Sequence, residues 1–262
     1  IINNYNKLGL DALISIGGDG SHDILRRIAQ KGNINMVGIP KTIDNDIGET
    51  EASVGYDTAV MVATEALDRL QPTAASHDRV MILEVMGRDA GHIALASGVA
   101  GGADIILIPE IPYSIDKVVE TINRVKKEER NFALMVVSEA VKTPEGEKVA
   151  TKDSDGKTLY GGIGAYLSDK ISELAKVEAR VTVLGHVQRG CPPTYRDRLL
   201  ATAFGVKAVE LIVEGKFDRM VAWKNREVVD IPIEKAIAAY HAVNPEDTLV
   251  RTARGLGISF GD

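Results

Sequence analysis

Short apolar runs alternate along the chain with longer segments of helical period. Each run is almost continuously apolar and rich in β-branched residues. This pattern is typical of parallel strands that are covered on both faces, because a strand with one wet face would alternate. The runs are Ala12–Ile16, Met36–Ile39, Val80–Val85, Ile105–Ile108, Ala133–Val137 and Val181–Leu184. The pattern therefore predicts a set of buried parallel strands.

Amphipathic segments separate these runs. Asp57–Leu70 places Val60, Ala63 and Leu67 on one face, behind an aspartate that could cap the helix. Ser114–Arg130 ends in a turn rich in Lys and Arg, which suits a helix C-terminus. Further helices are predicted at Ile163–Lys176 and Tyr195–Val213. The repeated β–α order predicts an α/β fold with doubly wound, mostly parallel sheets.

One stretch does not follow this alternation of apolar runs and amphipathic segments. Residues Lys142–Gly162 are polar, contain glycines and are rich in Lys, Asp and Glu. Such composition predicts a surface loop, either an ordinary solvated insertion or a segment beside an active site.

Composition and charge narrow the class of protein. The 262 residues are 45% hydrophobic and 26% charged, which excludes a disordered or fibrous chain. A net charge of −6 argues against nucleic acid as a partner, so any phosphate site must be a local arrangement of cations and backbone amides. Cys191 is the single cysteine, which excludes an internal disulfide and suits a reducing cytoplasm. The sequence has no apolar run near 18 residues and no signal peptide, so we expect no membrane association.

The first chemical motif follows the first predicted strand. Gly17, Gly18, Asp19, Gly20 and Ser21 stand between that strand and a helix. Glycines at such a turn let backbone N–H groups approach phosphate oxygens, and the helix N-terminus adds positive partial charge. Asp19 could hold Mg²⁺, which prefers carboxylate and phosphate oxygens. A tight turn without a ligand would also explain the glycines.

The second motif, PKTIDND, spans residues 40–46 directly after the strand Met36–Ile39. Asp44 and Asp46 are two carboxylates in one strand-end loop, where one could accept a hydroxyl proton and the other contact a metal ion. Thr42 adds a hydroxyl donor for a phosphate. An Asx-rich turn would account for Asn45 but not for the whole set.

Two further motifs also stand at strand ends. Met86, Gly87 and Arg88 follow Val80–Val85, and an arginine there could neutralise a transferring phosphoryl group. In LGHVQRG, residues 184–190, His186 and Arg189 together suit a sugar phosphate. In open α/β sheets ligands bind at the carboxyl ends of the strands, which favours a functional interpretation of both motifs.

Taken together, the motifs resemble those of the 6-phosphofructokinase family. GGDGS, PKTIDND, MGRDAGH, ILIPE and LGHVQRG occur in the family's order and spacing, and the similarity runs from about Leu8 to the C-terminus. The resemblance implies two similar Rossmann-like lobes with the active site between them. It implies a nucleotide lobe of residues 1–55 with 188–238 and a sugar-phosphate lobe of residues 56–187 with 239–262. The implied reaction is glycolytic phosphoryl transfer from ATP, with Mg²⁺, to the 1-hydroxyl of fructose 6-phosphate.

The resemblance also implies roles for individual residues. Asp44 matches the catalytic base, Thr42 the contact to the transferred phosphoryl group, and Arg88 the residue that stabilises charge in the transition state. Asp19 and Asp46 match metal-associated carboxylates. Residues implied on the donor side are Gly18, Asp19, Gly20, Ser21 and Lys41.

Contacts to the sugar phosphate are implied as well. They comprise Thr42, Asp44, Met86, Gly87, Arg88, Glu139, His186 and Arg189, and, from a neighbouring subunit, Arg79 and Arg180. Such sharing of sites implies a homodimer or homotetramer.

The phosphoryl donor depends on two positions. Glycine at position 20 leaves room for the nucleotide α-phosphate, where pyrophosphate users of the family tend to have Asp. Lys41 is the opposite indication, because pyrophosphate users have Lys there. We expect ATP, with a pyrophosphate-dependent enzyme as the alternative and a non-catalytic, regulatory homologue as a further one.

The chain departs from the family in two respects. Cys191 stands where a second glycine usually follows QRG. The family's leading glycine-rich phosphate loop does not appear, and the chain opens on Ile1 in what resembles a helix already under way. We therefore expect the natural protein to begin upstream. The effectors of an allosteric enzyme are not indicated by these residues.

Overall fold

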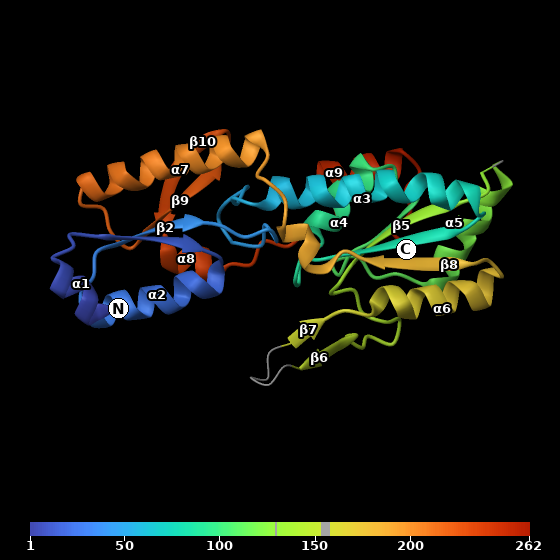
Figure 1. Ribbon diagram of the computed structural model, residues 1–262, viewed down its shortest axis with the longest axis horizontal. Helices are drawn as coiled ribbons and strands as arrows, with labels where there is room; N and C mark the ends of the chain where they lie inside the picture. Colours follow the sequence, from blue (N-terminus) through green and yellow to red (C-terminus); the bar gives the residue numbers. More distant parts are fainter. Residues whose placement is uncertain (129, 153–157) are drawn as a thin grey trace. The chain divides into compact units, whose positions relative to one another are not determined.

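The computed structural model describes residues 1–128, 130–152 and 158–262. The chain divides into two compact units (Figure 1). Unit 1 comprises Ile1–Thr58 and Pro192–His241, and unit 2 comprises Ala59–Cys191 and Ala242–Asp262. Each unit is therefore built from segments that lie far apart in the sequence.

Unit 1 contains a four-stranded sheet of order β1-β2-β9-β10. β1, β2 and β9 are parallel, and β10 runs antiparallel to β9. The elements are α1 (Ile2–Leu8), β1 (Leu13–Gly17), α2 (Asp19–Gly32), β2 (Met36–Pro40), α7 (Tyr195–Val213), β9 (Arg219–Lys224), β10 (Glu227–Pro232) and α8 (Ile233–Ala238).

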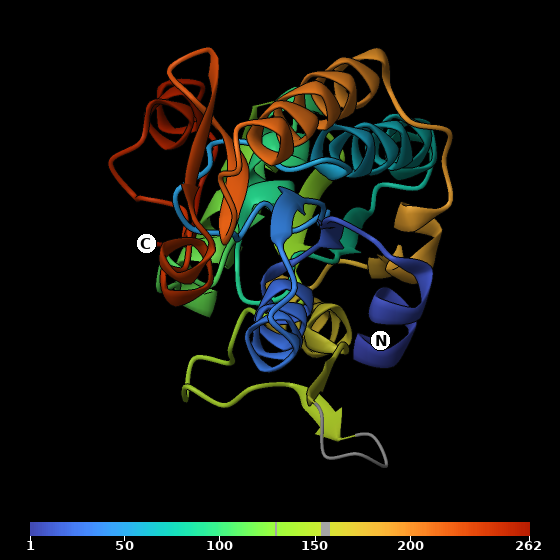
Figure 2. The same cartoon turned by 90° about the vertical axis from the view of Figure 1, so that its left-hand side faces the viewer.

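Helices cover both faces of this sheet. α2 lies on one face and α7 on the other (Figures 1 and 2). Met36 packs into the cluster beneath α2 and α8, whereas its neighbour Val37 packs with Phe204 of α7. β2 is buried at every position, which explains why its sequence is apolar without alternation.

Unit 2 contains a four-stranded sheet of order β4-β5-β3-β8 in which every neighbouring pair is parallel. The helix α3 begins in the last residues of the first segment of unit 1 and continues into unit 2. The elements are α3 (Tyr56–Ser76), β3 (Val80–Val85), α4 (His92–Ala100), β4 (Ile105–Leu107), α5 (Ile115–Lys127), β5 (Ala133–Ser138), α6 (Ile163–Ala175), β8 (Ala179–Val183), the 3₁₀ turn η1 (Gly185–Arg189) and α9 (Thr248–Gly255).

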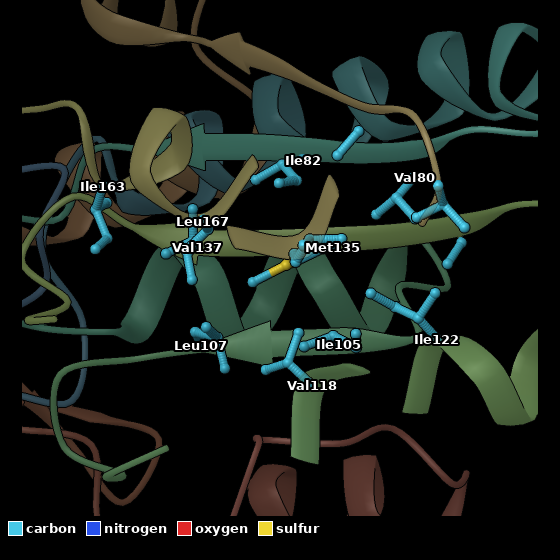
Figure 3. Close-up of a cluster of buried hydrophobic side chains, with 14 of the residues drawn as sticks. Val80, Ile82, Ile105, Leu107, Val118, Ile122, Met135, Val137, Ile163 and Leu167 are labelled. Carbon is cyan, nitrogen blue, oxygen red and sulfur yellow. The ribbon is translucent and has the colours of Figure 1, made fainter. Parts of the chain in front are cut away.

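Hydrophobic clusters cover both faces of the unit 2 sheet. Figure 3 shows Ile82, Met135 and Val137 of the sheet together with Val118 of α5 and Leu167 of α6. On the opposite face Met81 and Leu134 pack against Ala74 of α3. Neighbouring residues of one strand thus enter different clusters, as the alternation of side chains along a strand requires.

Helix ends in unit 2 are fixed by specific polar contacts. Ser114 caps α5 by accepting a hydrogen bond from the Asp116 N–H at 3.3 Å. Glu84, buried in the middle of the sheet, accepts bonds from the N–H groups of Gly162 and Gly164 at 3.2 and 2.8 Å. The Glu84 carboxylate on β3 therefore accepts the hydrogen bonds that an N-cap side chain would accept at the start of α6, whose own N-cap residue is glycine.

The predicted α/β class with mostly parallel sheets is confirmed. Every predicted apolar run contains a strand, with bounds that shift by one or two residues at several ends. The predicted cap Asp57 is wrong: this residue lies inside the first turn of α3, and Asp197 accepts the N–H bonds of Gly55 and Thr58 instead.

The expectation of a loop at Lys142–Gly162 is also wrong in part. Ala150–Lys152 (β6) and Thr158–Tyr160 (β7) pair as antiparallel strands, and residues 153–157 of the predicted loop lie outside the described residues. Each strand is too short for its polar sequence to show a clear period of two. The sequence analysis likewise did not predict the antiparallel pair β9 and β10.

Candidate active site

The first candidate site lies at the carboxyl ends of β1 and β2 in unit 1. These strands pair in parallel with Gly17 opposite Pro40, and the Lys41 N–H donates to the Gly17 carbonyl at 2.8 Å. The α2 N-terminus and the PKTIDND loop therefore leave the sheet at the same edge. A Cβ on Gly18 would lie 3.7 Å from the Cβ of Thr42, so the two motifs are in direct proximity.

The N-terminus of α2 carries the predicted glycine motif. Gly18 is the N-cap and makes no side-chain cap, and Asp19, Gly20 and Ser21 form the first turn. Gly17 and Gly20 differ in how much space the fold leaves for a side chain. A Cβ on Gly17 would come within 2.6 Å of the Ser21 Cβ, whereas a Cβ on Gly20 would meet nothing within 4 Å. Packing therefore requires glycine at position 17 but not at position 20.

His22 fixes this helix to both strands. Its ring is fully buried, with Nε2 3.2 Å from the Ile39 carbonyl and Nδ1 3.1 Å from the Ser15 hydroxyl. The carbonyl can only accept, so Nε2 carries the proton and Nδ1 accepts from Ser15. Burial lowers the pKa of His22, although its hydrogen bond to Ile39 acts in the opposite sense. A neutral histidine thus holds α2 against β1 and β2.

The second motif buries its carboxylates. Asp44 is 9% exposed and Asp46 is 4% exposed. The Thr42 hydroxyl donates to Asp44 Oδ2 at 3.2 Å and accepts from the Asp44 N–H at the same distance. Lys41, by contrast, is exposed and pairs with Val54 through its backbone. The loop thus presents a buried carboxylate in contact with a hydroxyl.

In unit 2, the loop after β3 carries Met86, Gly87 and Arg88. Glu139 Oε1 accepts hydrogen bonds from the N–H groups of Gly87 and Arg88 at 3.3 and 2.9 Å. Gly87 has φ +155°, and a Cβ there would lie 2.6 Å from the Ala90 carbonyl oxygen, so no other residue fits. Arg88 is itself left-handed with φ 54° and its side chain is exposed. The loop therefore presents the arginine from a fixed backbone.

His186 and Arg189 belong to η1, which follows β8 at the same edge of the unit 2 sheet. Both side chains are exposed, while Gln188 between them is buried. Gln188 Oε1 accepts from the Met86 N–H at 3.0 Å, which ties η1 to the loop that carries Arg88. Sequence reasoning missed Gln188 because a buried amide that contacts backbone 102 residues away leaves no periodic signal.

Arg79 and Arg180 lie elsewhere in unit 2. Arg79 directly precedes β3, and Arg180 is the second residue of β8, so both stand at the amino ends of their strands. Glu178 pairs with both, and its carboxylate lies 2.9 Å from Arg79 Nε. The hydrogen bond from Arg79, with that from Arg180, lowers the pKa of Glu178. The structure brings the two arginines together, but at the opposite end of the sheet from Arg88 and Arg189.

The described residues show neither a cluster of metal ligands nor a membrane-spanning helix. Residues 1–128, 130–152 and 158–262 contain no group of three or more His, Cys, Asp or Glu side chains that could hold a metal ion. In the same part of the chain, no helix is both long and apolar enough to cross a lipid bilayer.

Known proteins similar to this chain agree in one family. The family model described as Phosphofructokinase matches residues 1–212. An ATP-dependent 6-phosphofructokinase 1 from Nostoc sp. is 64% identical over the whole chain, and one from Synechocystis sp. is 62% identical. The chain spans 73% of the length of each.

A solved structure shows the same likeness in three dimensions. The pyrophosphate-dependent phosphofructokinase from Nitrosospira multiformis matches 93% of this chain with a TM-score of 0.78 and 25% identity. This chain spans 64% of that structure, slightly less than two thirds. The extent of the sequence match, together with the fold and the two motif-bearing sheet edges, shows that the chain belongs to the phosphofructokinase family.

Proposed function

We propose that this protein transfers the γ-phosphoryl group of ATP to the 1-hydroxyl of fructose 6-phosphate, giving fructose 1,6-bisphosphate and ADP. The observation that carries the proposal is the buried Asp44 carboxylate, in contact with the Thr42 hydroxyl, beside the N-terminus of α2. The relatives named ATP-dependent 6-phosphofructokinase support the choice of donor and acceptor.

Asp44 acts as the base in this proposal. Its carboxylate accepts the proton of the attacking 1-hydroxyl, so that the oxygen gains negative charge as it meets the phosphorus atom. The Thr42 hydroxyl, which donates to Asp44 in this structure, can turn that donor to the transferred phosphoryl group. Arg88 neutralises the charge on the phosphoryl oxygens. Little covalent work remains for the protein, since phosphoryl transfer depends mainly on positioning and charge neutralisation.

The donor phosphates are assigned to the N-terminus of α2. Its first turn, with Gly18, Asp19, Gly20 and Ser21, offers backbone N–H groups and the positive end of the helix dipole. Glycine in a helix costs up to about 1 kcal/mol relative to alanine. Because nothing in the structure would clash with a Cβ at position 20, the glycine there is explained by room for the nucleotide.

Lys41 favours the alternative donor, pyrophosphate. Its side chain is exposed at the edge where the two motifs of unit 1 meet. A lysine there could neutralise the compact charge of pyrophosphate, but it also suits the β- and γ-phosphates of ATP. We therefore assign Lys41 to the donor site and retain ATP on the strength of Gly20.

Mg²⁺ fits the residues present. Asp19 and Asp46 would hold it, and both offer the hard carboxylate oxygens that this ion prefers. Mg²⁺ usually takes one or two carboxylates from a protein and the rest of its coordination from phosphate and water. When bound, the ion supplies neutralisation of the charge on the donor phosphates.

The sugar phosphate is assigned to unit 2. Its proposed contacts come from the carboxyl ends of three neighbouring strands, where ligands of parallel sheets bind. Arg189 would pair with the 6-phosphate, His186 would hydrogen-bond it, and Glu139 would position the sugar and the Arg88 loop together. The set is Met86, Gly87, Arg88, Glu139, His186 and Arg189. The residues that we assign to the donor belong to unit 1.

Arg79 and Arg180 support an oligomer. They stand at the amino ends of β3 and β8, and the six residues of β3 span about 20 Å. Neither arginine can therefore serve the sugar-phosphate site at the other end of the same sheet. We assign both to the site of a neighbouring subunit in a homodimer or homotetramer. The single cysteine, Cys191, suits a cytoplasmic enzyme.

The product itself tests the proposed function. The intact protein is incubated with fructose 6-phosphate, ATP and Mg²⁺, and the sugar product is identified by phosphorus NMR. We expect a bisphosphate with its new phosphate on C1. The 1-deoxy analogue of fructose 6-phosphate is the matched control and should remain unchanged. Release of phosphate from ATP with no new sugar phosphate would contradict the proposal.

A further inference from the structure

The turn between the two carboxylates of PKTIDND has an unusual backbone. Asn45, which separates Asp44 from Asp46, has φ 54°. Side chains other than glycine rarely adopt this left-handed conformation, and asparagine tolerates it better than most. The backbone conformation of Asn45 determines the relative orientation of Asp44 and Asp46. Contacts that stabilise this conformation therefore also position both carboxylates.

The Asn45 side chain is buried and forms hydrogen bonds through both its nitrogen and its oxygen. It is 5% exposed, and its Nδ2 donates to the Glu51 carbonyl at 3.2 Å. Its Oδ1 accepts from the Ser53 N–H at 3.0 Å and lies 3.3 Å from the Ser53 hydroxyl. These contacts join the turn to a segment six to eight residues further along the chain.

Ser53 continues the connection to the carboxylate. Its hydroxyl, which is buried, donates to the Thr42 carbonyl at 2.7 Å, a shorter contact than the one to Asn45. Thr42 in turn bonds Asp44 through both its hydroxyl and the Asp44 N–H. The contacts therefore form a closed path from Asn45 through Ser53 and Thr42 to Asp44.

The turn is also held from its other side. His241 donates its backbone N–H to the Asp46 carbonyl at 2.9 Å, and its Nδ1 lies 3.0 Å from the Asn45 carbonyl. That support uses backbone carbonyls only. The Asn45 and Ser53 side chains are what connect the turn to Thr42 and hence to the Asp44 carboxylate.

We infer that Asn45 and Ser53 are positioning residues for the Asp44 carboxylate: together they hold the left-handed turn and the Thr42 hydroxyl in the arrangement that phosphoryl transfer needs. This inference rests on the proposed function, because it concerns the base of that reaction. Neither side chain needs to contact the substrate. Loss of either should lower kcat, since a small misplacement of a catalytic group costs up to about 100-fold in rate.

Two variants separate the parts of this arrangement. Asn45→Gly keeps the left-handed backbone accessible and removes all three side-chain contacts, so we expect kcat to fall by about 100-fold. Ser53→Ala removes the hydroxyl contacts to the Thr42 carbonyl and to Asn45 Oδ1 but keeps the bond from the Ser53 N–H, and we expect about a tenfold fall in kcat. In both variants KM for fructose 6-phosphate should stay within about twofold, because the residues of unit 2 that we assign to the sugar phosphate are unchanged. Ser53→Thr keeps the hydroxyl and should restore kcat.

Thr50→Val is the matched control. The Thr50 hydroxyl is buried in the same loop but donates to the Ala52 carbonyl and accepts from the Trp223 N–H, away from Thr42. Its removal should lower stability towards urea as much as Ser53→Ala does, while kcat is retained. If kcat falls equally in Thr50→Val and Ser53→Ala, the effect is that of a loosened loop and the inference is wrong.

The outcomes distinguish this inference from the proposed function. Wild-type kcat in Asn45→Gly and Ser53→Ala, with Asp44→Ser inactive, would overturn the positioning role and leave the function in place. Turnover by Asp44→Ser would overturn the base assignment instead. If the wild-type protein turned over no donor, the proposed function would fail. Hydrogen exchange at the Asp44 and Asn45 amides then tests the contacts: faster exchange in Ser53→Ala supports them, and unchanged exchange overturns them.

Discussion

Asp44 shows how a single residue combines burial with a specific partner. Its carboxylate is largely removed from solvent, yet it keeps the Thr42 hydroxyl as a donor. A base in such a place holds its proton acceptor where the substrate hydroxyl must arrive, without competition from bulk water.

Asp44→Ser should abolish most turnover. Serine is smaller and cannot accept the proton of the sugar hydroxyl near neutral pH, so we expect kcat to fall by about 10³-fold or more. The dissociation constant for fructose 6-phosphate, measured by calorimetry, should change little because Arg189 and His186, which we assign to the 6-phosphate, are unaltered. Turnover within tenfold of the wild-type value would remove Asp44 from the role of base.

Substitutions at Gly20 should separate stability from donor binding. The open space around this position means that Gly20→Ala is tolerated and increases the free energy of unfolding by up to about 1 kcal/mol. Gly20→Asp should fold equally well but raise KM for ATP strongly, because its carboxylate meets the nucleotide phosphates. Urea unfolding and ATP titration measure the two effects. An unchanged KM for ATP in Gly20→Asp would contradict the assignment of Gly20.

At the scale of elements, α2 depends on one buried histidine. His22 links the helix to β1 through Ser15 and to β2 through Ile39, and it is neutral in the folded protein. Because α2 carries at its N-terminus the glycine turn that we propose binds phosphate, the same contacts that stabilise unit 1 also place that turn against the PKTIDND loop.

The buried histidine should make stability fall in acid. Burial lowers the pKa of His22 in the folded state below the 6.5 of an unfolded chain. The unfolded state therefore binds a proton first as the pH falls, and stability is lost below about pH 6.5 until the folded pKa is reached. His22→Gln should remove this component of the pH dependence. Urea unfolding between pH 5 and 8 measures it, and an identical slope in both proteins would contradict the prediction.

The sequence predicted elements best where both faces of a strand are buried. β2, β3 and β5 are apolar at nearly every position, and their runs could be found without a structure. β9 and β10 were not predicted because they contain polar residues, which in the sequence are typical of a solvated surface. In the structure two of these residues, Arg219 and Asp230, form an ion pair across the strands. Polar character alone therefore does not exclude a strand.

The same contrast holds for the site. The residues to which we assign chemical roles stand in motifs at strand ends and were named from the sequence. The residues that hold them were not: Gln188 contacts the Met86 N–H, and Asp197 contacts Gly55 and Thr58, over separations of more than a hundred residues. Such contacts depend on the tertiary fold and leave no local pattern.

At the scale of the whole molecule, the proposed oligomer depends on the placement of Arg79 and Arg180. Both pair with Glu178 at the amino ends of their strands, away from the carboxyl ends where the residues proposed to bind the sugar phosphate lie. An enzyme that uses these arginines must bring them to the site of a neighbouring subunit. Activity should then depend on the oligomer.

Mixing two inactive variants tests this sharing. Asp44→Ser and the double variant Arg79→Ala, Arg180→Ala should each be nearly inactive alone. Unfolded together and refolded, they should regain about a quarter of wild-type activity if sites are shared in a dimer, because half the dimers are mixed and each has one intact site. No recovery in mixtures that form hybrid oligomers would contradict the sharing of sites.

We propose that a phosphoryl group passes from ATP to fructose 6-phosphate at the edge of the sheet where α2 and the PKTIDND loop meet. The most direct test is a coupled assay of the intact wild-type protein with fructose 6-phosphate and Mg²⁺, supplied with either ATP or pyrophosphate. We predict turnover with ATP and none with pyrophosphate, since Gly20 leaves room for the nucleotide. Turnover with pyrophosphate alone would contradict the account and make Lys41 the residue that determines the donor.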